Sequence, residues 1–266
     1  PRLRILAVIA VHNEVEYLHV LLPLLAAQSI DVAIIDNSVG REIPAALKAY
    51  GGRPVTEIIR QPYNGEFSLS RQLELKRKIF NRAEHDWVVH HDVDEIMEGV
   101  QPGMDLRSLI EAADQDGANC INFREFVFLP RPEEDLSGAD YYRCMLRYYP
   151  FAPQENRLNR AWRSDLAASN MEHGGHFLLG QGIVRYREDQ VLRHYPVLSA
   201  EHARVKYVGR LFAAEDRVKG WHKSRLGITE DALGLPGEDP RLLRLGDDQE
   251  RPDFSKVPVE RHFWEW

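Results

Sequence analysis

The first 129 residues alternate short apolar runs with segments of helical spacing, and this alternation restricts the possible folds more than any other feature. The run at residues 3–11 is almost continuously apolar, as expected of a strand that is buried on both faces. Further strand-like runs follow at residues 32–35, 55–59, 87–91 and 118–129. Helical patterns separate them at residues 17–28, 44–50, 68–82 and 106–114. Such an alternation predicts an α/β fold with a mostly parallel central sheet flanked by helices.

The second half of the chain is less regular. Residues 182–186 and 190–195 resemble the two strands of a hairpin, and residues 200–214 are expected to form one helix. From residue 235 onward the chain is rich in Pro, Gly and Asp, which is typical of irregular structure over a surface. We therefore expect one domain in two halves, residues 1–129 and 130–234, followed by an irregular tail at residues 235–266.

Charge and composition argue against several classes of protein. The formal net charge of −7 and the pI near 5.9 disfavour a nucleic-acid-binding protein. The apolar stretch at residues 18–27 is too short to cross a bilayer. The start of the chain leads directly into His12 without a cleavage site, which favours a first core strand over a signal peptide. The two cysteines, Cys120 and Cys144, form no disulfide framework and fit a reducing compartment, so we expect a cytoplasmic protein.

Polar clusters follow four of the expected strands. In parallel sheets, ligands bind beyond the carboxyl ends of the strands, so these clusters mark the expected site. They are Asn13-Glu14, Asp36-Asn37, residues 60–64 and Asp92-Val93-Asp94. The sequence therefore predicts a polar site along one edge of the sheet.

Asp92 and Asp94 are the residues in these clusters with the clearest chemistry. Side chains at i and i+2 share a face of a strand, so both carboxylates can reach one site. Hard cations such as Mg²⁺ and Mn²⁺ prefer oxygen ligands of this kind. An acidic turn with no ligand is the alternative. His90 and His91 precede the pair, but adjacent strand residues face opposite ways, so at most one of them is expected near the site.

These motifs together resemble those of family 2 glycosyltransferases of the GT-A fold, in particular a bacterial subgroup with a D-x-D-E motif. The resemblance covers about residues 3–210. The matching pieces are Val11-His12-Asn13-Glu14, Ile35-Asp36-Asn37-Ser38, Asp92-Val93-Asp94-Glu95 and Arg193-His194-Tyr195-Pro196 with the helix after it.

The resemblance implies a role for each matching residue. It places Asn13 and Glu14 near the nucleotide, and Asp36, with Asn37 beside it, near the base or ribose. It assigns Asp92 to the ribose and donor sugar, and Asp94 to a divalent metal, Mn²⁺ or Mg²⁺. His194 would complete the metal or diphosphate site. Residues 1–129 would then bind the nucleotide sugar, and residues 130–234 would bind the acceptor and complete the metal site. Asp36 as a turn residue and His194 as an ordinary hydrogen-bonded histidine remain alternatives.

The catalytic base has no clear counterpart in the sequence. Glu172, in a glycine-bearing segment, is the best-placed carboxylate, and Glu125 is the next choice. His173 and His176 are further candidates, as a base or as metal ligands. A basic, aromatic segment could contact acceptor or phosphate oxygens, or it could be a solvated strand face; its residues are Arg157, Arg160, Trp162 and Arg163.

The expected activity is metal-dependent transfer of a sugar from a nucleotide-diphosphate donor to an acceptor hydroxyl, with inversion implied by the resemblance. A nucleotidyltransferase or related phosphoryl-transfer enzyme is the nearest alternative. Such enzymes usually follow the first strand with a glycine-rich basic loop, whereas residues 12–16 contain no glycine and two acids. A non-catalytic carbohydrate-binding protein is a second alternative, which would not need the Asp92-Asp94 pair. No phosphate-binding P-loop, dinucleotide motif or nucleophile elbow is present in the sequence.

Overall fold

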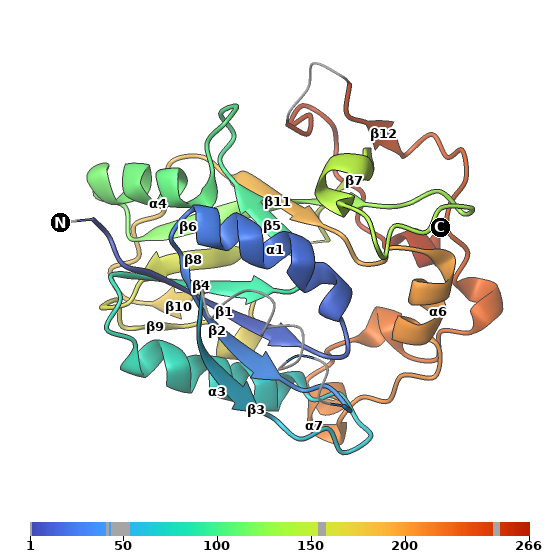
Figure 1. Ribbon diagram of the computed structural model, residues 1–266, viewed down its shortest axis with the longest axis horizontal. Helices are drawn as coiled ribbons and strands as arrows, with labels where there is room; N and C mark the ends of the chain where they lie inside the picture. The colour runs from blue at the N-terminus through green and yellow to red at the C-terminus, as the bar shows by residue number, and fades with distance from the viewer. Residues whose placement is uncertain (1, 41–42, 44–53, 154–157, 247–250) are drawn as a thin grey trace.

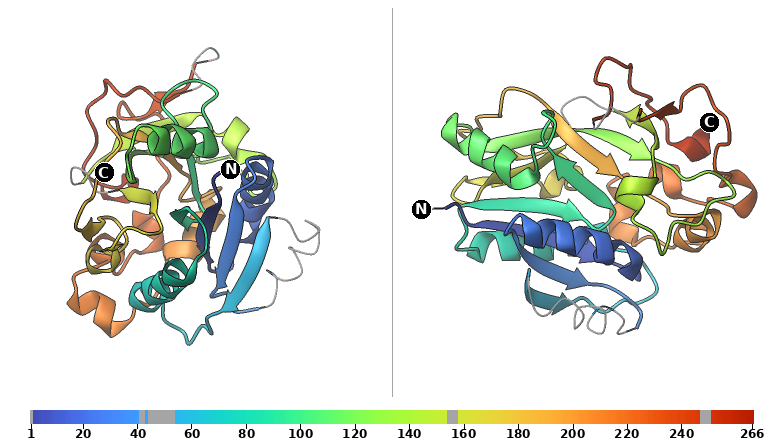
Figure 2. Two further views of the ribbon diagram at one scale, coloured as in Figure 1. Left: turned by 90° about the vertical axis from the view of Figure 1, so that its left-hand side faces the viewer. Right: turned by 45° about the horizontal axis from the view of Figure 1, so that its top comes forward.

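A strand that is apolar on both faces needs a layer on each side, and β1 (Ile5–Val11) has one on each. Its odd-numbered residues belong to a core cluster shared with helices α1 (Val15–Ala27) and α4 (Leu106–Gln115). Its even-numbered residues pack in a second cluster with Ile79 and Phe80 of α3 (Leu69–Arg82). Helices therefore cover both faces of the sheet, and α1 and α3 lie on opposite sides of it (Figures 1 and 2).

The computed structural model describes residues 2–40, 43, 54–153, 158–246 and 251–266. The remaining strands of the described chain are β2 (Asp31–Asp36), β3 (Val55–Arg60), β4 (Trp87–Asp92), β5 (Glu95–Glu98), β6 (Cys120–Phe128), β7 (Arg147–Phe151), β8 (Asn159–Arg163), β9 (Ala168–Ser169), β10 (Leu179–Gly180), β11 (Gln190–His194) and β12 (Leu243–Arg244). The other helices are α5 (Tyr141–Cys144), α6 (Ala200–Tyr207) and α7 (Ala214–Val218), with short 3₁₀ turns η1 (Met171–His173), η2 (Lys223–Arg225), η3 (Glu230–Ala232) and η4 (Phe263–Glu265).

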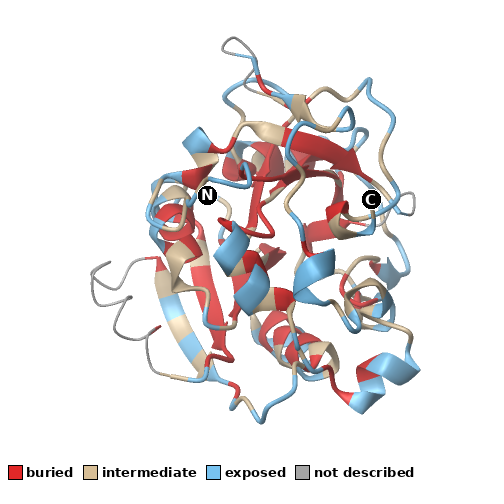
Figure 3. Cartoon of the chain, turned by 90° about the vertical axis from the view of Figure 1, so that its right-hand side faces the viewer, coloured by how far each residue is buried: buried red, intermediate tan, exposed pale blue. Residues whose placement is uncertain are grey.

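The centre of the sheet is parallel, as the alternating pattern predicts. β4, β1, β2 and β3 lie side by side in that order, and all three pairings are parallel. Beyond β4 the sheet continues through β8, β6, β7 and β12 in antiparallel pairings, while β11 runs parallel to β6 and antiparallel to β5. The central strands are buried, whereas the edge strand β3 alternates between half-buried and exposed residues (Figure 3). This mixed α/β architecture confirms the expected fold class.

Side-chain caps define where several helices begin. Ser68 accepts a hydrogen bond from the Arg71 backbone N–H at 3.3 Å at the start of α3, and Asp105 accepts one from Ser108 at 2.8 Å at the start of α4. Ser199 does the same for the His202 backbone N–H at 3.1 Å in α6. Each cap satisfies an N–H that has no partner within its helix, and a cap of this kind typically contributes about 1 kcal/mol.

Several expectations for the second half of the chain are wrong. Residues 182–186 and 190–195 do not form a hairpin, because β11 pairs with β5 and β6. The expected helix at residues 200–214 is two helices, α6 and α7, because the chain turns at Gly209 with a φ of +68°. The sequence pattern also missed β5, β7 and β8, which are short antiparallel strands of the same sheet. The helix expected at residues 44–50 lies outside the described residues.

Residues 235–246 and 251–266, the described part of the tail, have little regular structure and pack into the molecule. Phe263 is buried in a third apolar cluster together with Tyr149 of β7. The Trp266 ring also contacts Tyr149, with 4.8 Å between ring centroids. The tail therefore covers the β7 side of the sheet.

The strand register brings the polar clusters to one edge of the sheet. Val11 pairs with Asp36 of β2, and Ala10 pairs with Asp92 of β4. The loops that follow β1, β2 and β4 therefore leave the sheet side by side. Among the described helices, none is both long and apolar enough to span a bilayer.

Candidate active site

A cavity of about 280 Å³ opens at this carboxyl edge of the sheet. Its floor is formed by the ends of β1, β4 and β11, and its far wall by the segment after α6. The site residues expected from the sequence that line it are Glu14, Asp92, Asp94 and His194, together with the further candidates Glu125, Arg160 and His176. Other polar or aromatic residues in its lining are His12, Phe67, Gln72, His90, Glu95, Lys206, Arg210, Trp221, His222, Ser224, Arg225 and His262.

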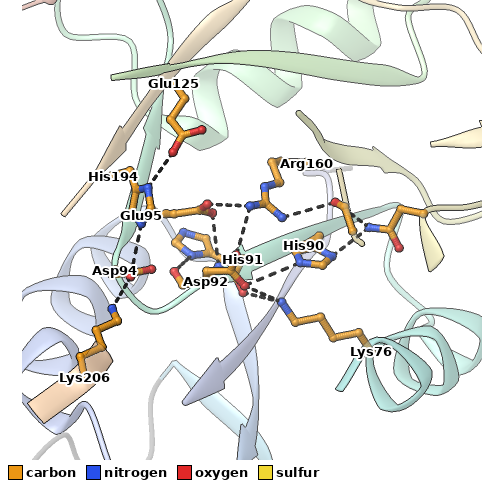
Figure 4. A network of polar contacts seen from close by, with 12 residues as sticks. Lys76, His90, His91, Asp92, Asp94, Glu95, Glu125, Arg160, His194 and Lys206 are labelled. Atoms are coloured by element: carbon orange, nitrogen blue, oxygen red, sulfur yellow. Dashed lines mark hydrogen bonds and ion pairs between the residues drawn. The ribbon is translucent and has the colours of Figure 1, made fainter. Parts of the chain in front are cut away.

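Asp94 lies between two cationic or potentially cationic side chains. Its Oδ2 is 3.4 Å from His194 Nε2 and accepts a hydrogen bond from Lys206 Nζ at 2.8 Å. Lys206 also lies 2.7 Å from Glu14 Oε1 and donates to the Pro196 carbonyl at 2.9 Å. Figure 4 shows that Asp94 contacts Lys206 on one side and His194 on the other. Burial favours the neutral acid, but Lys206 and His194 hold the pKa of Asp94 well below its usual range.

His194 is oriented by a second carboxylate. Its Nδ1 lies 2.6 Å from Glu125 Oε1 on the neighbouring strand β6 (Figure 4). Burial opposes the charged imidazolium, but Asp94 and Glu125 raise the pKa of His194 well above its usual value. The ring is thus fixed with Nδ1 toward Glu125 and Nε2 toward Asp94.

Asp92 belongs to a separate network on the other side of the strand end. Its two oxygens lie 3.1 Å from Lys76 Nζ and 3.1 Å from an Arg160 guanidinium nitrogen. Arg160 also binds Glu95 Oε1 at 2.6 Å. Burial favours neutral Asp92, yet Lys76 and Arg160 hold its pKa well below the usual range, whereas burial raises the pKa of Glu95 to about 7. The Asp92 side chain is 37% exposed and that of Asp94 is 13% exposed, so Asp92 presents the more accessible carboxylate.

One glycine allows a loop to approach this network closely. Gly175 has a φ of +86°, and a Cβ atom there would lie 2.7 Å from His90 Cε1. In the same segment, Asn170 Nδ2 donates to His90 Nδ1 at 2.8 Å. Of the two adjacent histidines, His90 lines the cavity, while His91 turns its Nδ1 to the Asp92 backbone carbonyl at 2.7 Å. This agrees with the expectation that at most one of them lies near the site.

The residues present fit a divalent cation that is shared with a substrate. Ligands of Mg²⁺ each lie about 2.1 Å from the ion, so two atoms 3.4 Å apart, as Asp94 Oδ2 and His194 Nε2 are, can bind one ion. A ligating histidine usually gives its second ring nitrogen to a carboxylate, and Glu125 occupies that position. In the described part of the chain, no three or more His, Cys, Asp or Glu side chains form a complete metal site. An ion here would therefore take its further ligands from water or from a bound molecule.

The remaining residues assigned to the nucleotide lie beside the cavity and do not line it. Asn13, with a φ of 58°, joins the loops after β1 and β2: its N–H donates to Ser38 Oγ at 3.0 Å, and its Oδ1 accepts from the Val39 N–H at 2.8 Å. Asp36 is buried and paired with Arg60 at 2.7 Å. The Asn37 carbonyl lies 2.8 Å from Nδ1 of His12. Asn13, Asp36 and Asn37 therefore lie behind His12, which itself lines the cavity.

The candidate bases are placed very differently. Glu125 is buried inside the cavity and bound to His194, whereas Glu172 is exposed in η1. Glu172 is not part of the cavity lining, but Gly174 and His176 of the same segment are. Glu172 therefore sits at the rim of the cavity.

The two arginines of β8 differ in how far they are exposed to solvent. Arg160 is buried and paired with two carboxylates, so the alternative prediction of a solvated strand face is wrong for this residue. Arg163 is half-exposed and paired with Asp114 and Asp165, while Trp162 packs in the core against Phe80. Arg157 lies outside the described residues.

Sequence reasoning missed several residues that line the cavity or hold its side chains. Lys206 lies in the last turn of α6, where a lysine is typical of a solvated helix end. Lys76 lies within α3, yet it is fully buried, and its amine donates a hydrogen bond to the backbone carbonyl of His91 in β4. Arg210, Trp221 and Arg225 come from loops without a recognisable motif. A lysine twelve positions after the motif histidine is the single sequence signal that could have suggested Lys206.

Comparisons with known proteins give a distant structural likeness. No protein-family model matches the chain, and no curated protein sequence matches it. Among solved structures, it is similar to the crystal structure of residues 1–349 of S. aureus TarS, with 12% identity, 72% of this chain and 60% of that chain covered, and a TM-score of 0.43. The same protein in complex with UDP gives 11% identity, coverages of 73% and 61%, and a TM-score of 0.45. This chain spans about three fifths of the TarS chains, and at these TM-scores the likeness carries no argument about function.

Proposed function

We propose that this chain is a glycosyltransferase that moves a sugar from a nucleotide-diphosphate donor to an acceptor hydroxyl, with inversion at the anomeric carbon. A divalent cation, Mn²⁺ or Mg²⁺, is held by Asp94 and His194 in this proposal. The observation that carries it is the arrangement of Asp94 and His194, 3.4 Å apart, with Glu125 behind the histidine and Asp92 on the same strand end. The resemblance of the four sequence motifs to family 2 glycosyltransferases supports the same activity.

The charges of the cavity suit a diphosphate donor. When bound, the cation would stabilise the negative charge that develops on the leaving diphosphate. Lys206 adds a positive charge beside Asp94, and its pairing with Glu14 fixes its position. Asp92, held by Lys76 and Arg160, offers its accessible carboxylate to the hydroxyls of the donor. The nucleoside would lie toward His12, whose position depends on the loops that Asn13 joins and on the carbonyl of Asn37.

The acceptor hydroxyl needs a general base. Glu125 is engaged by His194, so its carboxylate already orients a cation ligand. We assign the base to Glu172, an exposed residue two positions before Gly174, which lines the cavity. A base must reach hydrogen-bond distance of the acceptor once the complex has formed, and an exposed carboxylate at the rim can do so.

The proposal is tested by incubating the pure protein with a panel of UDP, GDP, dTDP and ADP sugars, with and without Mn²⁺, and measuring nucleoside-diphosphate release. We expect release with one class of donor, and a dependence on the cation. Asp94→Asn should lower turnover about a hundredfold or more and remove the cation-dependent part of nucleotide binding, because the charge that holds the ion is lost. Asp116→Asn, an exposed aspartate paired with Arg187, is the matched control and should change neither quantity.

Each alternative function has its own outcome in the same assay. Pyrophosphate release from a nucleoside triphosphate with a sugar phosphate would establish a nucleotidyltransferase instead. Binding of sugars with no affinity for any nucleotide would establish a carbohydrate-binding protein. Asp94→Asn with unchanged turnover and an unchanged melting temperature would overturn the assignment of the cation site.

A further inference from the structure

The far wall of the cavity carries two arginines that the proposed donor site does not use. Arg210 follows α6 and Arg225 ends η2, and both are half-buried residues of the cavity lining. Within the residues that the structure describes, neither guanidinium forms a hydrogen bond or an ion pair, and their contacts are with aromatic rings. The Arg210 guanidinium carbon lies 4.3 Å from the centroid of Phe67, and that of Arg225 lies 5.8 Å from the centroid of Tyr207.

The two arginines add positive charge to this wall, and no carboxylate of the described residues forms an ion pair with either of them. Burial lowers the pKa of the Arg210 guanidinium, Glu14 opposes that shift, and the charge of Arg225 adds to it. The two carboxylates between these arginines in the sequence are already engaged: Asp216 accepts from two backbone N–H groups at the start of α3, and Glu215 accepts from Ser68. In a chain with a net charge of −7, such a pair is not part of a general basic surface.

His222 lies beside the arginines with an unused polar atom. Its ring is stacked on Phe212 with 4.5 Å between centroids. Burial lowers its pKa to about 4, and the charges of Arg225 and Arg210 act in the same direction. The buried Nε2 has no hydrogen-bond partner among the described residues, and its nearest carboxylate oxygen, on Asp216, is 3.9 Å away. A buried polar atom without a partner is costly, so a ligand atom at this wall would satisfy it.

The same wall offers an aromatic surface next to the rim. Trp221 lines the cavity and is half-buried, and a Cβ atom on Gly174 would lie 3.6 Å from its indole ring. The Glu172 segment and Trp221 therefore border the same end of the cavity. Aromatic side chains combined with a few charged groups are typical of small-molecule sites.

We propose that this arginine wall, defined by Arg210, His222 and Arg225, binds an anionic substituent of the saccharide acceptor, a carboxylate or a phosphate, while Trp221 packs against the sugar. The inference rests on the proposed function and names the class of its acceptor. The donor diphosphate already has Lys206 and the cation held by Asp94 to balance its charge. Two further guanidiniums suit a second anion, since Arg binds carboxylate and phosphate oxygens through paired N–H groups.

The test compares charged and neutral probes in the presence of Mn²⁺ and the nucleoside diphosphate that the protein binds. Isothermal titration with glucuronate, glucose 6-phosphate and glucose separates a carboxylate from a phosphate and both from the neutral sugar. We expect one charged probe to bind about tenfold or more tightly than glucose, because hydrogen bonds to charged groups are the strong ones. Arg225→Met should remove that preference and leave the affinity for the nucleoside diphosphate within about twofold.

Lys223→Met is the matched control, because it removes the same charge from an exposed position two residues away. It should leave the preference unchanged, and the melting temperature of each variant checks that it is folded. Equal binding of charged and neutral probes to the unaltered protein would overturn the proposal. So would an Arg225→Met variant that loses nucleoside-diphosphate affinity as much as probe affinity, since the arginine would then belong to the donor site. Failure of the proposed function is distinct, because the unaltered protein would then bind no nucleoside diphosphate.

Discussion

His194 Nδ1 lies 2.6 Å from Glu125 Oε1, and this contact directs the opposite ring nitrogen toward Asp94. The two residues come from adjacent parallel strands, β11 and β6, so the sheet itself fixes their spacing. The contact fixes one side of the cation site, while Lys206, held by Glu14, supplies a positive charge on the other side.

Glu125→Gln should therefore weaken cation binding. Glutamine keeps the size of the side chain but lacks the charge that orients and polarises the imidazole. Loss of such an outer carboxylate typically lowers metal affinity about 10–100-fold. Mn²⁺ titration followed by electron paramagnetic resonance measures this without relying on activity. Glu188→Gln, an exposed control, should bind Mn²⁺ as the unaltered protein does, and the same result for Glu125→Gln would contradict the assigned role.

Glu172→Gln should reduce sugar transfer about a hundredfold or more, which is the usual contribution of a general base. The affinity for the nucleoside diphosphate should be unchanged, because Glu172 lies at the rim, outside the cavity lining. Single-turnover transfer and nucleotide titration measure the two quantities separately. Normal transfer by Glu172→Gln, together with a loss in Glu125→Gln at saturating Mn²⁺, would move the base to Glu125. If neither variant loses transfer, a histidine of the His173 to His176 segment becomes the candidate.

The parallel part of the fold could be predicted because each strand there is a continuous apolar run followed by a polar turn. β1, β2 and β4 were expected within two residues of where they lie. β5, β7 and β8 were missed because they are only four or five residues long, and β5 and β8 also carry charged residues that are buried in pairs. Glu98 of β5, for example, is buried because Arg193 of β11 binds it at 2.6 Å, and no local pattern encodes that partner.

The residues of the candidate site could also be predicted only in part from the sequence. Asp92, Asp94 and His194 could be named from motifs, since each directly follows or ends a strand. Lys76 could not, and Arg160 could be named only as part of a basic segment, because each acts through its contact with Asp92, which is 16 and 68 residues away along the chain. Side chains that neutralise a buried carboxylate depend on the tertiary fold, and sequence spacing does not reveal them.

Arg160→Met should destabilise the protein strongly. Arg160 is buried between Asp92 and Glu95, and its removal leaves two carboxylates close together without their shared counterion. Removing one partner of a buried ion pair typically costs about 3–5 kcal/mol of unfolding free energy. Urea denaturation measures the change. Arg163→Met is the control on the same strand: its side chain is 35% exposed, so its ion pairs should contribute about 1 kcal/mol or less. Equal effects of the two substitutions would contradict the account of Arg160.

Stability should fall as the pH decreases from about 6.5 toward 4, because several buried histidines are neutral in the folded protein. Burial lowers the pKa of His90 to about 3, and that of His91, His202 and His222 to about 4. In the unfolded chain a histidine has a pKa near 6.5. Between these values the unfolded state binds more protons than the folded state, so acid favours unfolding, and each histidine contributes about 1.4 kcal/mol per pH unit at most.

His202→Asn tests this directly. His202 faces Glu16 of α1 at 3.8 Å, and its pKa is lowered by burial first and then by Lys206, with Glu14 and Asp94 opposing. Its Nδ1 accepts a hydrogen bond from the Leu198 N–H at 3.1 Å, and the Oδ1 of asparagine can take over that bond without titrating. Urea unfolding at pH 7, 6 and 5 should show a slope with pH that is smaller by about one proton in this variant. Arg204→Gln, exposed on the same helix, should keep the full slope. An unchanged slope in His202→Asn would show that this histidine binds protons equally in the folded and the unfolded protein, which would contradict its lowered pKa.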